Sequence, residues 1–238
     1  IFKSGSRNYW LFNSEILKNN YGMMEMKELA EQLRKPHGEN SKLVTDLMAI
    51  SNRPLYEFTY KKLDLFPEAN ILEVGPADGH FVHDLFKIEN SVSYTGVDLS
   101  EDMIKAADQI NSDLVKNEKA RFTKGDILEL PFDENSFDRI FTVNTLYFWS
   151  DPEKGIRVLN RILKPSGKLF IVIRSKESME KMPFTQYGFT MYSKDELIQL
   201  LTENGFSAVS VLLISETAEL PSGGKADMIS FCAIAEKK

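Results

Sequence analysis

The chain has 238 residues, of which 42% are hydrophobic and 27% charged, a composition typical of a globular protein with one hydrophobic core. Its 35 acidic and 29 basic residues give a net charge of −6, which argues against a general nucleic-acid-binding protein because such proteins need a basic surface. No apolar run approaches the roughly 20 residues of a membrane-spanning helix, and the first residues lack the apolar segment of a signal peptide. We therefore expect a cytoplasmic protein without a membrane span.

Residues that commonly bind metal ions are few. The single cysteine, Cys232, cannot form an internal disulfide, and the apolar run around it predicts a buried strand residue. The three histidines, His37, His80 and His83, have no cysteine or histidine partners at the spacing of a zinc site. We predict no metal site, and a reducing compartment.

The segment after residue 24 predicts helices. Apolar residues in 25–34 fall on one face at a spacing of 3.6 residues. Residues 34–40 contain a proline and a glycine and predict a loop. Two further helices are expected at 41–50 and 54–65, the second with Pro54 in its first turn.

From residue 70 the pattern changes to alternating strands and helices, which predicts a parallel sheet covered on both faces. The expected strands are 71–74, 92–97, 120–124, 137–143 and 168–173, and the expected helices are 80–87, 100–116, 153–163 and 193–204. Two last strands, 208–215 and 227–235, leave no room for a crossover helix between them. The expected fold class is α/β: a Rossmann-like, seven-stranded, mostly parallel sheet with an antiparallel C-terminal hairpin and an N-terminal helical extension.

A glycine-rich loop and an aspartate mark the carboxyl ends of the first two strands. Gly75 and Gly79 follow the first strand, where glycines let the backbone turn sharply and approach a ligand. Asp98 ends the second strand, and a carboxylate there can accept hydrogen bonds from two ribose hydroxyls. The alternatives are a tight turn without a ligand and a cap on the next helix. NAD-binding folds place an acid at a similar point, so Asp98 indicates a nucleoside without naming it.

The segments together resemble class I S-adenosylmethionine-dependent methyltransferases of the ubiquinone/menaquinone type. Glu73, Gly75 and Gly79 match the family's acidic residue followed by Gly-x-Gly-x-Gly, with Ala77 in place of the middle glycine. That replacement is tolerable if residue 77 has a negative φ, and otherwise distorts the loop. Gly125-Asp126-Ile127, Ser136–Ile140, Thr142–Pro152 and Leu163–Lys168 follow in the family's order, and the resemblance covers residues 70–170.

The resemblance implies S-adenosylmethionine as the cofactor. The glycine loop would approach its methionine part, and Glu73 would orient the loop or the ligand. Asp126 would meet the exocyclic amine of the adenine and Ile127 would pack on its ring, unless the two are a polar turn and a core residue. Asn144, after the fourth strand, would bond the cofactor's amino acid part or the substrate. The implied cofactor-binding residues are Glu73, Gly75, Pro76, Ala77, Gly79, Asp98, Leu99, Asp126, Ile127 and Asn144.

Four residues are candidates for contacting the substrate. Tyr147 and Trp149 can stack on a planar or apolar acceptor, or can be packing aromatics. Arg174 can bind a substrate carboxylate or lie in solvent, and His37 lies in a loop expected to cover the site. His80, beside the glycine loop, is a candidate cofactor contact or base, although a surface histidine is more common. The sequence identifies no catalytic residue.

The expected reaction is methyl transfer by direct displacement to a small-molecule acceptor, whose identity and methylated atom stay open. Residues 1–66 would form a helical segment covering the active site, and 67–238 the S-adenosylmethionine-binding domain. One alternative is a nicotinamide-dependent oxidoreductase, although His80 breaks its Gly-x-Gly-x-x-Gly spacing. Another is a non-catalytic scaffold member of the same fold, which only Ala77 favours.

Residues 1–22 lie outside the resemblance. We expect an appended segment that the methyltransferase core does not require. Its aromatic and aliphatic residues are too numerous for a solvated tail. The segment should dock on the protein or on a second subunit, which leaves a homodimer open.

Overall fold

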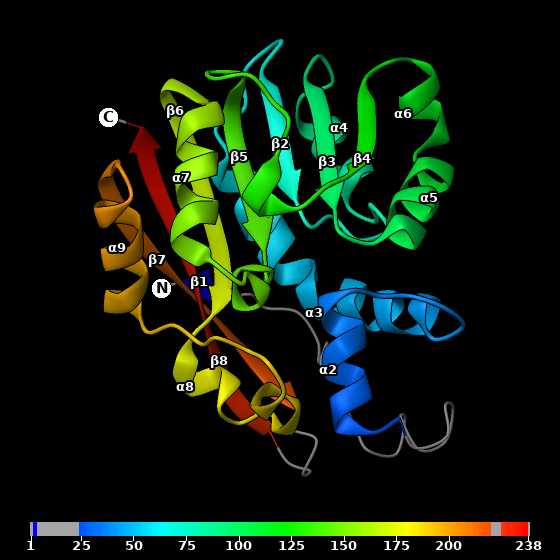
Figure 1. Ribbon diagram of the computed structural model, residues 1–238, viewed down its shortest axis with the longest axis vertical. Helices are drawn as coiled ribbons and strands as arrows, with labels where there is room; N and C mark the ends of the chain where they lie inside the picture. Colours follow the sequence, from blue (N-terminus) through cyan, green and yellow to red (C-terminus); the bar gives the residue numbers. More distant parts are fainter. Residues whose placement is uncertain (1, 4–23, 220–224, 238) are drawn as a thin grey trace.

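The computed structural model describes residues 2–3, 24–219 and 225–237. Its centre is an eight-stranded sheet in the order β1-β7-β8-β6-β5-β2-β3-β4. The strands are β1 (Phe2–Lys3), β2 (Asn70–Val74), β3 (Ser93–Asp98), β4 (Ala120–Lys124), β5 (Phe137–Val143), β6 (Leu163–Arg174), β7 (Phe206–Glu219) and β8 (Lys225–Lys237). Only β8 runs antiparallel to its neighbours, β6 and β7, and the other pairs are parallel (Figure 1).

This topology confirms the predicted α/β fold, including the antiparallel hairpin of β7 and β8. The short strand β1 was not predicted and pairs in parallel with the outer edge of β7. Most of the appended segment 1–22 and the connection 220–224 between β7 and β8 lie outside the described residues.

Helices cover both faces of the sheet. The α-helices are α2 (Met26–Arg34), α3 (Ser41–Lys62), α4 (Val82–Ile88), α5 (Glu101–Ile110), α6 (Ser112–Lys116), α7 (Pro152–Ile162), α8 (Lys176–Met179) and α9 (Lys194–Glu203). The short 3-10 helices are η1 (Ile127–Glu129), η2 (Leu146–Phe148) and η3 (Pro183–Gln186). Within the described part of the chain, no helix combines the length and the apolar character needed to cross a membrane.

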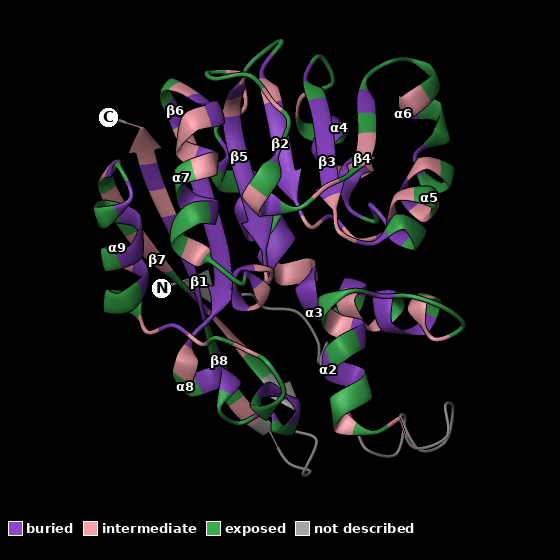
Figure 2. Cartoon of the chain, in the orientation of Figure 1, coloured by how far each residue is buried: buried purple, intermediate pink, exposed green. Residues whose placement is uncertain are grey.

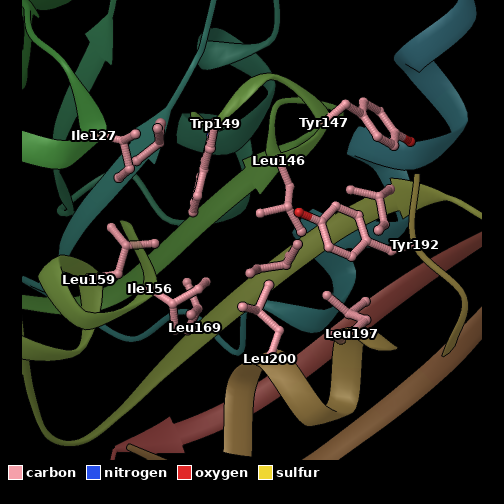
Figure 3. Packing of buried hydrophobic residues seen from close by; sticks show 14 of the residues in the cluster. Ile127, Leu146, Tyr147, Trp149, Ile156, Leu159, Leu169, Tyr192, Leu197 and Leu200 are labelled. Atoms are coloured by element: carbon pink, nitrogen blue, oxygen red, sulfur yellow. The ribbon is translucent and has the colours of Figure 1, made fainter. Parts of the chain in front are cut away.

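The alternation of side chains along each strand divides the core into two layers. In β6, Leu169 and Ile171 pack with α7 and α9, whereas Phe170 and Val172 pack with α3 and α4 on the other face. The central strands β2, β5 and β6 are therefore mostly buried from both sides, whereas the outer strands β4 and β7 also carry exposed residues (Figure 2). Figure 3 shows the first layer, in which Ile156 of α7 and Leu200 of α9 lie against the sheet.

The predicted break between helices 41–50 and 54–65 is wrong. The chain forms one helix, α3, with Pro54 inside it. Proline lacks the N–H that would bond the carbonyl of residue 50, and its ring disturbs the turn before it. The neighbouring carbonyl, that of Ser51, accepts a hydrogen bond at 3.1 Å from the Arg174 guanidinium.

The predicted helix 100–116 is instead two helices, α5 and α6, separated at Asn111. The buried Asn111 amide donates to the carbonyls of Ala107 and Gly79, so it ends α5 while it holds the glycine loop. Ser100 caps α5, and Ser193 forms a capping box with Glu196 at the start of α9.

The parallel strands all end at the same edge of the sheet, and α2 and the first part of α3 lie beyond that edge in Figure 1. The loops after β2, β3, β4 and β5 therefore face the two N-terminal helices. This arrangement creates the cleft described next.

Candidate functional site

A cleft with about 1000 Å³ of empty space, open solvent at its mouth included, lies between the strand ends and the N-terminal helices. Its walls come from the loops after β2, β3, β4 and β5 and from α2 and α3. The predicted site residues that line it are Gly75, Pro76, Ala77, Asp98, Leu99, Asp126, Ile127, Asn144 and Trp149.

Two positions of the glycine loop require glycine. Gly75 has a φ of +76° and Gly79 a φ of +68°, both in the left-handed region that glycine adopts readily. A Cβ on Gly75 would collide with the Thr145 side chain, and one on Gly79 would lie 2.7 Å from the Asn111 amide nitrogen. Gly79 does not line the cleft and instead supports the loop from behind.

Ala77 does not have the negative φ that would make it a harmless replacement for glycine. Its φ is +51°, which costs a residue with a Cβ about 1–2 kcal/mol. The amide N–H of Ala77 donates to the Asp98 carboxylate at 3.1 Å, and that of Gly75 to the Val97 carbonyl at 2.8 Å. These bonds hold Ala77 in its strained conformation.

Asp98 joins the glycine loop to the start of α5. One carboxylate oxygen accepts from the amide of Ala77, and the other accepts from the amide of Ser100 at 2.8 Å. The capping bond of α5 comes from the Ser100 hydroxyl and not from Asp98, so the capping alternative is wrong. Burial raises the pKa of Asp98. Each oxygen has a further lone pair, so a ligand in the cleft can still donate to this carboxylate.

Glu73 lies behind the loop, outside the lining of the cleft. Its carboxylate is buried and accepts hydrogen bonds from the hydroxyls of Tyr56 and Tyr94, each at 2.5 Å. Burial raises the pKa of Glu73 to about 7, although the two hydroxyls counteract that rise. The three residues come from β2, α3 and β3. Glu73 thus fastens α3 to the sheet beneath the glycine loop.

The far part of the cleft combines one carboxylate with an apolar surface. Asp126 is exposed and caps η1 by accepting from the amide of Leu128 at 3.0 Å. Ile127 is buried and borders the cleft while it packs in the core beside Trp149 (Figure 3). These contacts agree with the alternative assignment, in which Asp126 belongs to a polar turn and Ile127 is a core residue. Both residues nevertheless border the cleft.

Asn144 stands at the centre of the site in the left-handed region, with a φ of +56°. Its amide donates to the Asn52 side-chain oxygen at 2.9 Å, and its own oxygen accepts from the Tyr147 hydroxyl at 3.0 Å. Asn144 therefore links α3, η2 and the end of β5 in one hydrogen-bonded chain.

A methyltransferase-domain family model matches residues 72–171. The chain is 33% identical over 132 residues to the uncharacterized methyltransferase YdaC of Bacillus subtilis (strain 168), an alignment that covers 56% of this chain and 71% of YdaC. The chain belongs to the S-adenosylmethionine-dependent methyltransferase family. It is also 29% identical over 168 residues to the ubiquinone/menaquinone biosynthesis C-methyltransferase UbiE of Rickettsia bellii (strain RML369-C), which covers 68% of this chain and 67% of UbiE.

Solved structures agree with this membership at the level of the fold. A SAM-dependent methyltransferase from Aquifex aeolicus superposes with a TM-score of 0.62 at 21% identity, over 91% of this chain and all of the other. A possible histamine N-methyltransferase from Thermotoga maritima gives a TM-score of 0.61 at 21% identity, over 90% and 100% of the two chains. S-adenosylmethionine is the cofactor of this methyltransferase family.

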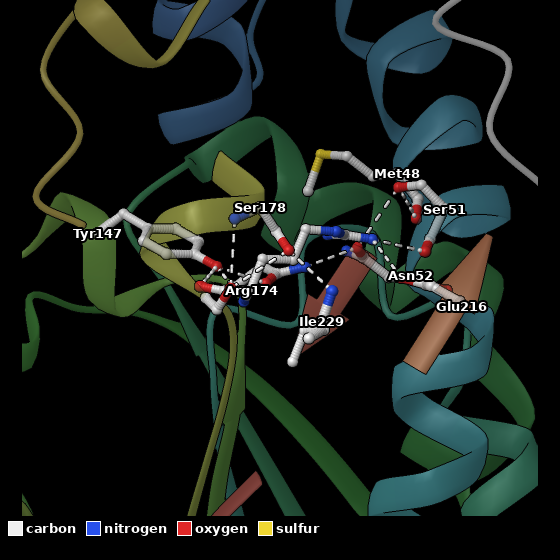
Figure 4. A network of polar contacts seen from close by, with 10 residues as sticks. Met48, Ser51, Asn52, Tyr147, Arg174, Ser178, Glu216 and Ile229 are labelled. Atoms are coloured by element: carbon white, nitrogen blue, oxygen red, sulfur yellow. Dashed lines mark hydrogen bonds and ion pairs between the residues drawn. The ribbon is translucent and has the colours of Figure 1, made fainter. Parts of the chain in front are cut away.

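Tyr147 and Arg174 of this methyltransferase do not border the main cleft. Both line a second, smaller cavity beside it. Arg174 is buried, so the alternative of a solvated arginine is wrong. Its guanidinium lies 3.4 Å from the Glu216 carboxylate, and its backbone amide contacts the Tyr147 hydroxyl (Figure 4). Trp149 borders the main cleft and also packs closely against Gly155 in the core.

The remaining histidine candidates are exposed. His37 lines neither cavity, and a ring nitrogen lies 2.9 Å from the carbonyl of Lys35. His80 borders the cleft, with a ring nitrogen 3.2 Å from the Arg53 guanidinium. No group of three or more histidine, cysteine or acidic side chains in the described residues could hold a metal ion.

Sequence reasoning missed several polar residues of the methyltransferase site, chiefly Asn52 and Asp78. Asp78 occupies a variable position of the glycine motif, where no residue type is expected. Asn52 lies on α3, whose pattern indicates only a helix. Its position beside Asn144 depends on how α3 crosses the strand ends, and no local signal reports that crossing.

Proposed function

We propose that this methyltransferase transfers the methyl group of S-adenosylmethionine directly to a small-molecule acceptor. The position of Asp98 carries the proposal. Its carboxylate borders the cleft at the end of β3 and is held there by two backbone amides. A carboxylate fixed in this way can accept both ribose hydroxyls through charged hydrogen bonds.

The residues around the cleft fit the cofactor. Gly75 borders the cleft without a side chain, so a ligand can approach the backbone of the loop closely. An exposed carboxylate at Asp126 beside the apolar Ile127 suits an aromatic ring with an exocyclic amine. We assign Gly75, Pro76, Ala77 and Asn144 to the methionine part, Asp98 and Leu99 to the ribose, and Asp126 and Ile127 to the adenine. Gly79 and Glu73 lie behind the loop, and we assign them to its support and orientation.

When bound, S-adenosylmethionine supplies a methyl group on a sulfonium, which a lone pair of the acceptor takes while the electrons of the broken carbon–sulfur bond remain on the sulfur. The contribution of the chain is alignment and exclusion of water. Met48 of α3 and Leu33 of α2 supply the apolar cover on the side opposite the strand ends. We assign no catalytic base among the described residues, because His80 is exposed and close to the cationic Arg53.

The cover over the cleft supports a small acceptor over a protein or nucleic acid. Residues 1–66 would form this covering segment and 67–238 the cofactor-binding domain. The proposal also includes a cytoplasmic location. The net charge of −6 supports an acceptor other than nucleic acid, because it gives the chain no general basic surface.

The proposal is tested by incubating the purified chain with S-adenosylmethionine and a set of small metabolites, with release of S-adenosylhomocysteine as the readout. We expect at least one metabolite to raise the release above the background. At a cofactor concentration below saturation, Asp98→Ala should reduce that rise, whereas Asp108→Ala, on α5 outside the lining of the cleft, should not. Cofactor binding without turnover on any metabolite would favour the non-catalytic scaffold.

A further inference from the structure

The second cavity has about 500 Å³ of empty space, open solvent included, and adjoins the cofactor cleft. Five residues line both spaces: Leu33, Met48, Asn52, Asn144 and Phe148. The two spaces are therefore neighbours across a collar made by these five side chains. A molecule in the second cavity would reach the cofactor cleft through that collar.

The walls of the second cavity beyond the collar are mainly apolar. Met179 and Met182 are buried thioether side chains, which adapt to ligands of irregular shape. Phe189 packs against Phe148 with a distance of 4.7 Å between ring centroids, and against Phe184 with 5.5 Å. This aromatic wall suits a flat, apolar ligand.

The charged groups at the inner end of the cavity already balance one another. The Arg174 guanidinium lies 3.4 Å from the Glu216 carboxylate, and both side chains are only 7% exposed. The guanidinium also donates to the Ser51 carbonyl at 3.1 Å (Figure 4). A ligand carboxylate placed here would lose its hydration and would face Glu216 as well as Arg174, which disfavours an anion.

The polar groups at the collar are uncharged. Asn52 and Asn144 are joined by a hydrogen bond at 2.9 Å, and Tyr147 donates to Asn144. Amides and a hydroxyl at the passage between the two spaces can orient one polar atom of a ligand toward the cofactor without requiring charge on it.

We propose that the second cavity binds the methyl acceptor, and that this acceptor is an uncharged, mainly apolar ring compound whose single polar atom faces the Asn52–Asn144 collar. This inference rests on the proposed function of the neighbouring cleft. The sequence suggested that Arg174 could bind a substrate carboxylate. We infer a neutral ligand instead, because Arg174 is already paired with Glu216.

The charge of the ligand can be tested with two probes that share one ring system. We would titrate the chain, saturated with S-adenosylhomocysteine, with 2-naphthol and with 2-naphthoate by calorimetry at neutral pH. The uncharged naphthol should bind at least tenfold more tightly than the anionic naphthoate. In Glu216→Gln, which leaves the arginine charge unbalanced, this preference should shift toward naphthoate by at least tenfold.

The location is tested at Phe189, which is only half-buried, so its substitution should leave the fold intact. Phe189→Asp should weaken naphthol binding at least tenfold and leave S-adenosylhomocysteine binding unchanged. Tyr187→Asp makes the same kind of change at an exposed aromatic that lines neither cavity, and should have no effect. This pair keeps the test decisive even if Glu216→Gln fails to fold.

Three results would overturn the inference while the proposed function stands. These are equal or tighter binding of naphthoate, binding of neither probe, and naphthol binding that Phe189→Asp does not alter, each with normal S-adenosylhomocysteine affinity. Failure of S-adenosylhomocysteine to bind would instead overturn the proposed function.

Discussion

Replacing Ala77 with glycine should stabilise the protein, although the residue lies in its binding loop. The left-handed conformation of Ala77, at a φ of +51°, costs about 1–2 kcal/mol that glycine does not incur. Glycine loses about 0.5–1 kcal/mol more backbone entropy on folding, so the net gain should be about 0.5–1 kcal/mol. For a chain of this length such a gain raises the melting temperature by about 1–4 °C.

The assay is urea unfolding of three variants, followed by circular dichroism. Ala208→Gly changes another left-handed alanine, at a φ of +48° on β7 and outside both cavities, and should stabilise to a similar extent. Ala106→Gly changes an alanine inside α5 and should destabilise by about 1 kcal/mol. If Ala77→Gly destabilises as much as Ala106→Gly, the strain assigned to position 77 is wrong.

Three further outcomes are expected. Asp98→Ala should weaken S-adenosylhomocysteine binding in calorimetry by about 1–3 kcal/mol through the loss of charged hydrogen bonds, with Asp108→Ala as a control, and unchanged affinity would remove the ribose role. The pKa of Glu73 is raised in the fold from 4.5 to about 7, so its burial lowers the free energy of unfolding as the pH rises through that interval. Relative to Glu73→Gln, the wild type should therefore lose up to about 3 kcal/mol between pH 4.5 and 7, and parallel pH profiles of the two proteins would contradict this. Deleting residues 1–22 should preserve S-adenosylhomocysteine binding but lower solubility or change the oligomeric state seen by light scattering, and a folded truncation that no longer binds would place the segment in the site.

The parts of the site that depend on local chain chemistry could be predicted from the sequence. Gly75 and Gly79 stand where a strand turns into a helix, and the backbone there has the positive φ that only glycine adopts freely. Asp98 ends a strand, and the ends of parallel strands share one edge of the sheet. The alternation of strands and helices likewise predicted a parallel sheet covered on both faces, and the side chains of β6 do pack alternately into two core layers.

The parts that depend on long-range contacts could not be predicted. Arg174 is paired with Glu216, which lies on β7 and meets it only after the hairpin has returned alongside β6. Glu73 contacts two tyrosines from separate elements, so its buried position has no signature near residue 73. The second cavity is partly lined by α8 and η3, which are too short to show a helical period in the sequence.

The most direct test of the cofactor assignment is a calorimetric titration of the wild-type chain with S-adenosylhomocysteine and, separately, with NAD. We expect S-adenosylhomocysteine to bind once per chain and NAD to produce no binding signal, because His80 breaks the Gly-x-Gly-x-x-Gly spacing that NAD-binding loops use. Binding of NAD, or no binding of S-adenosylhomocysteine to the folded chain, would contradict the assignment of this cleft.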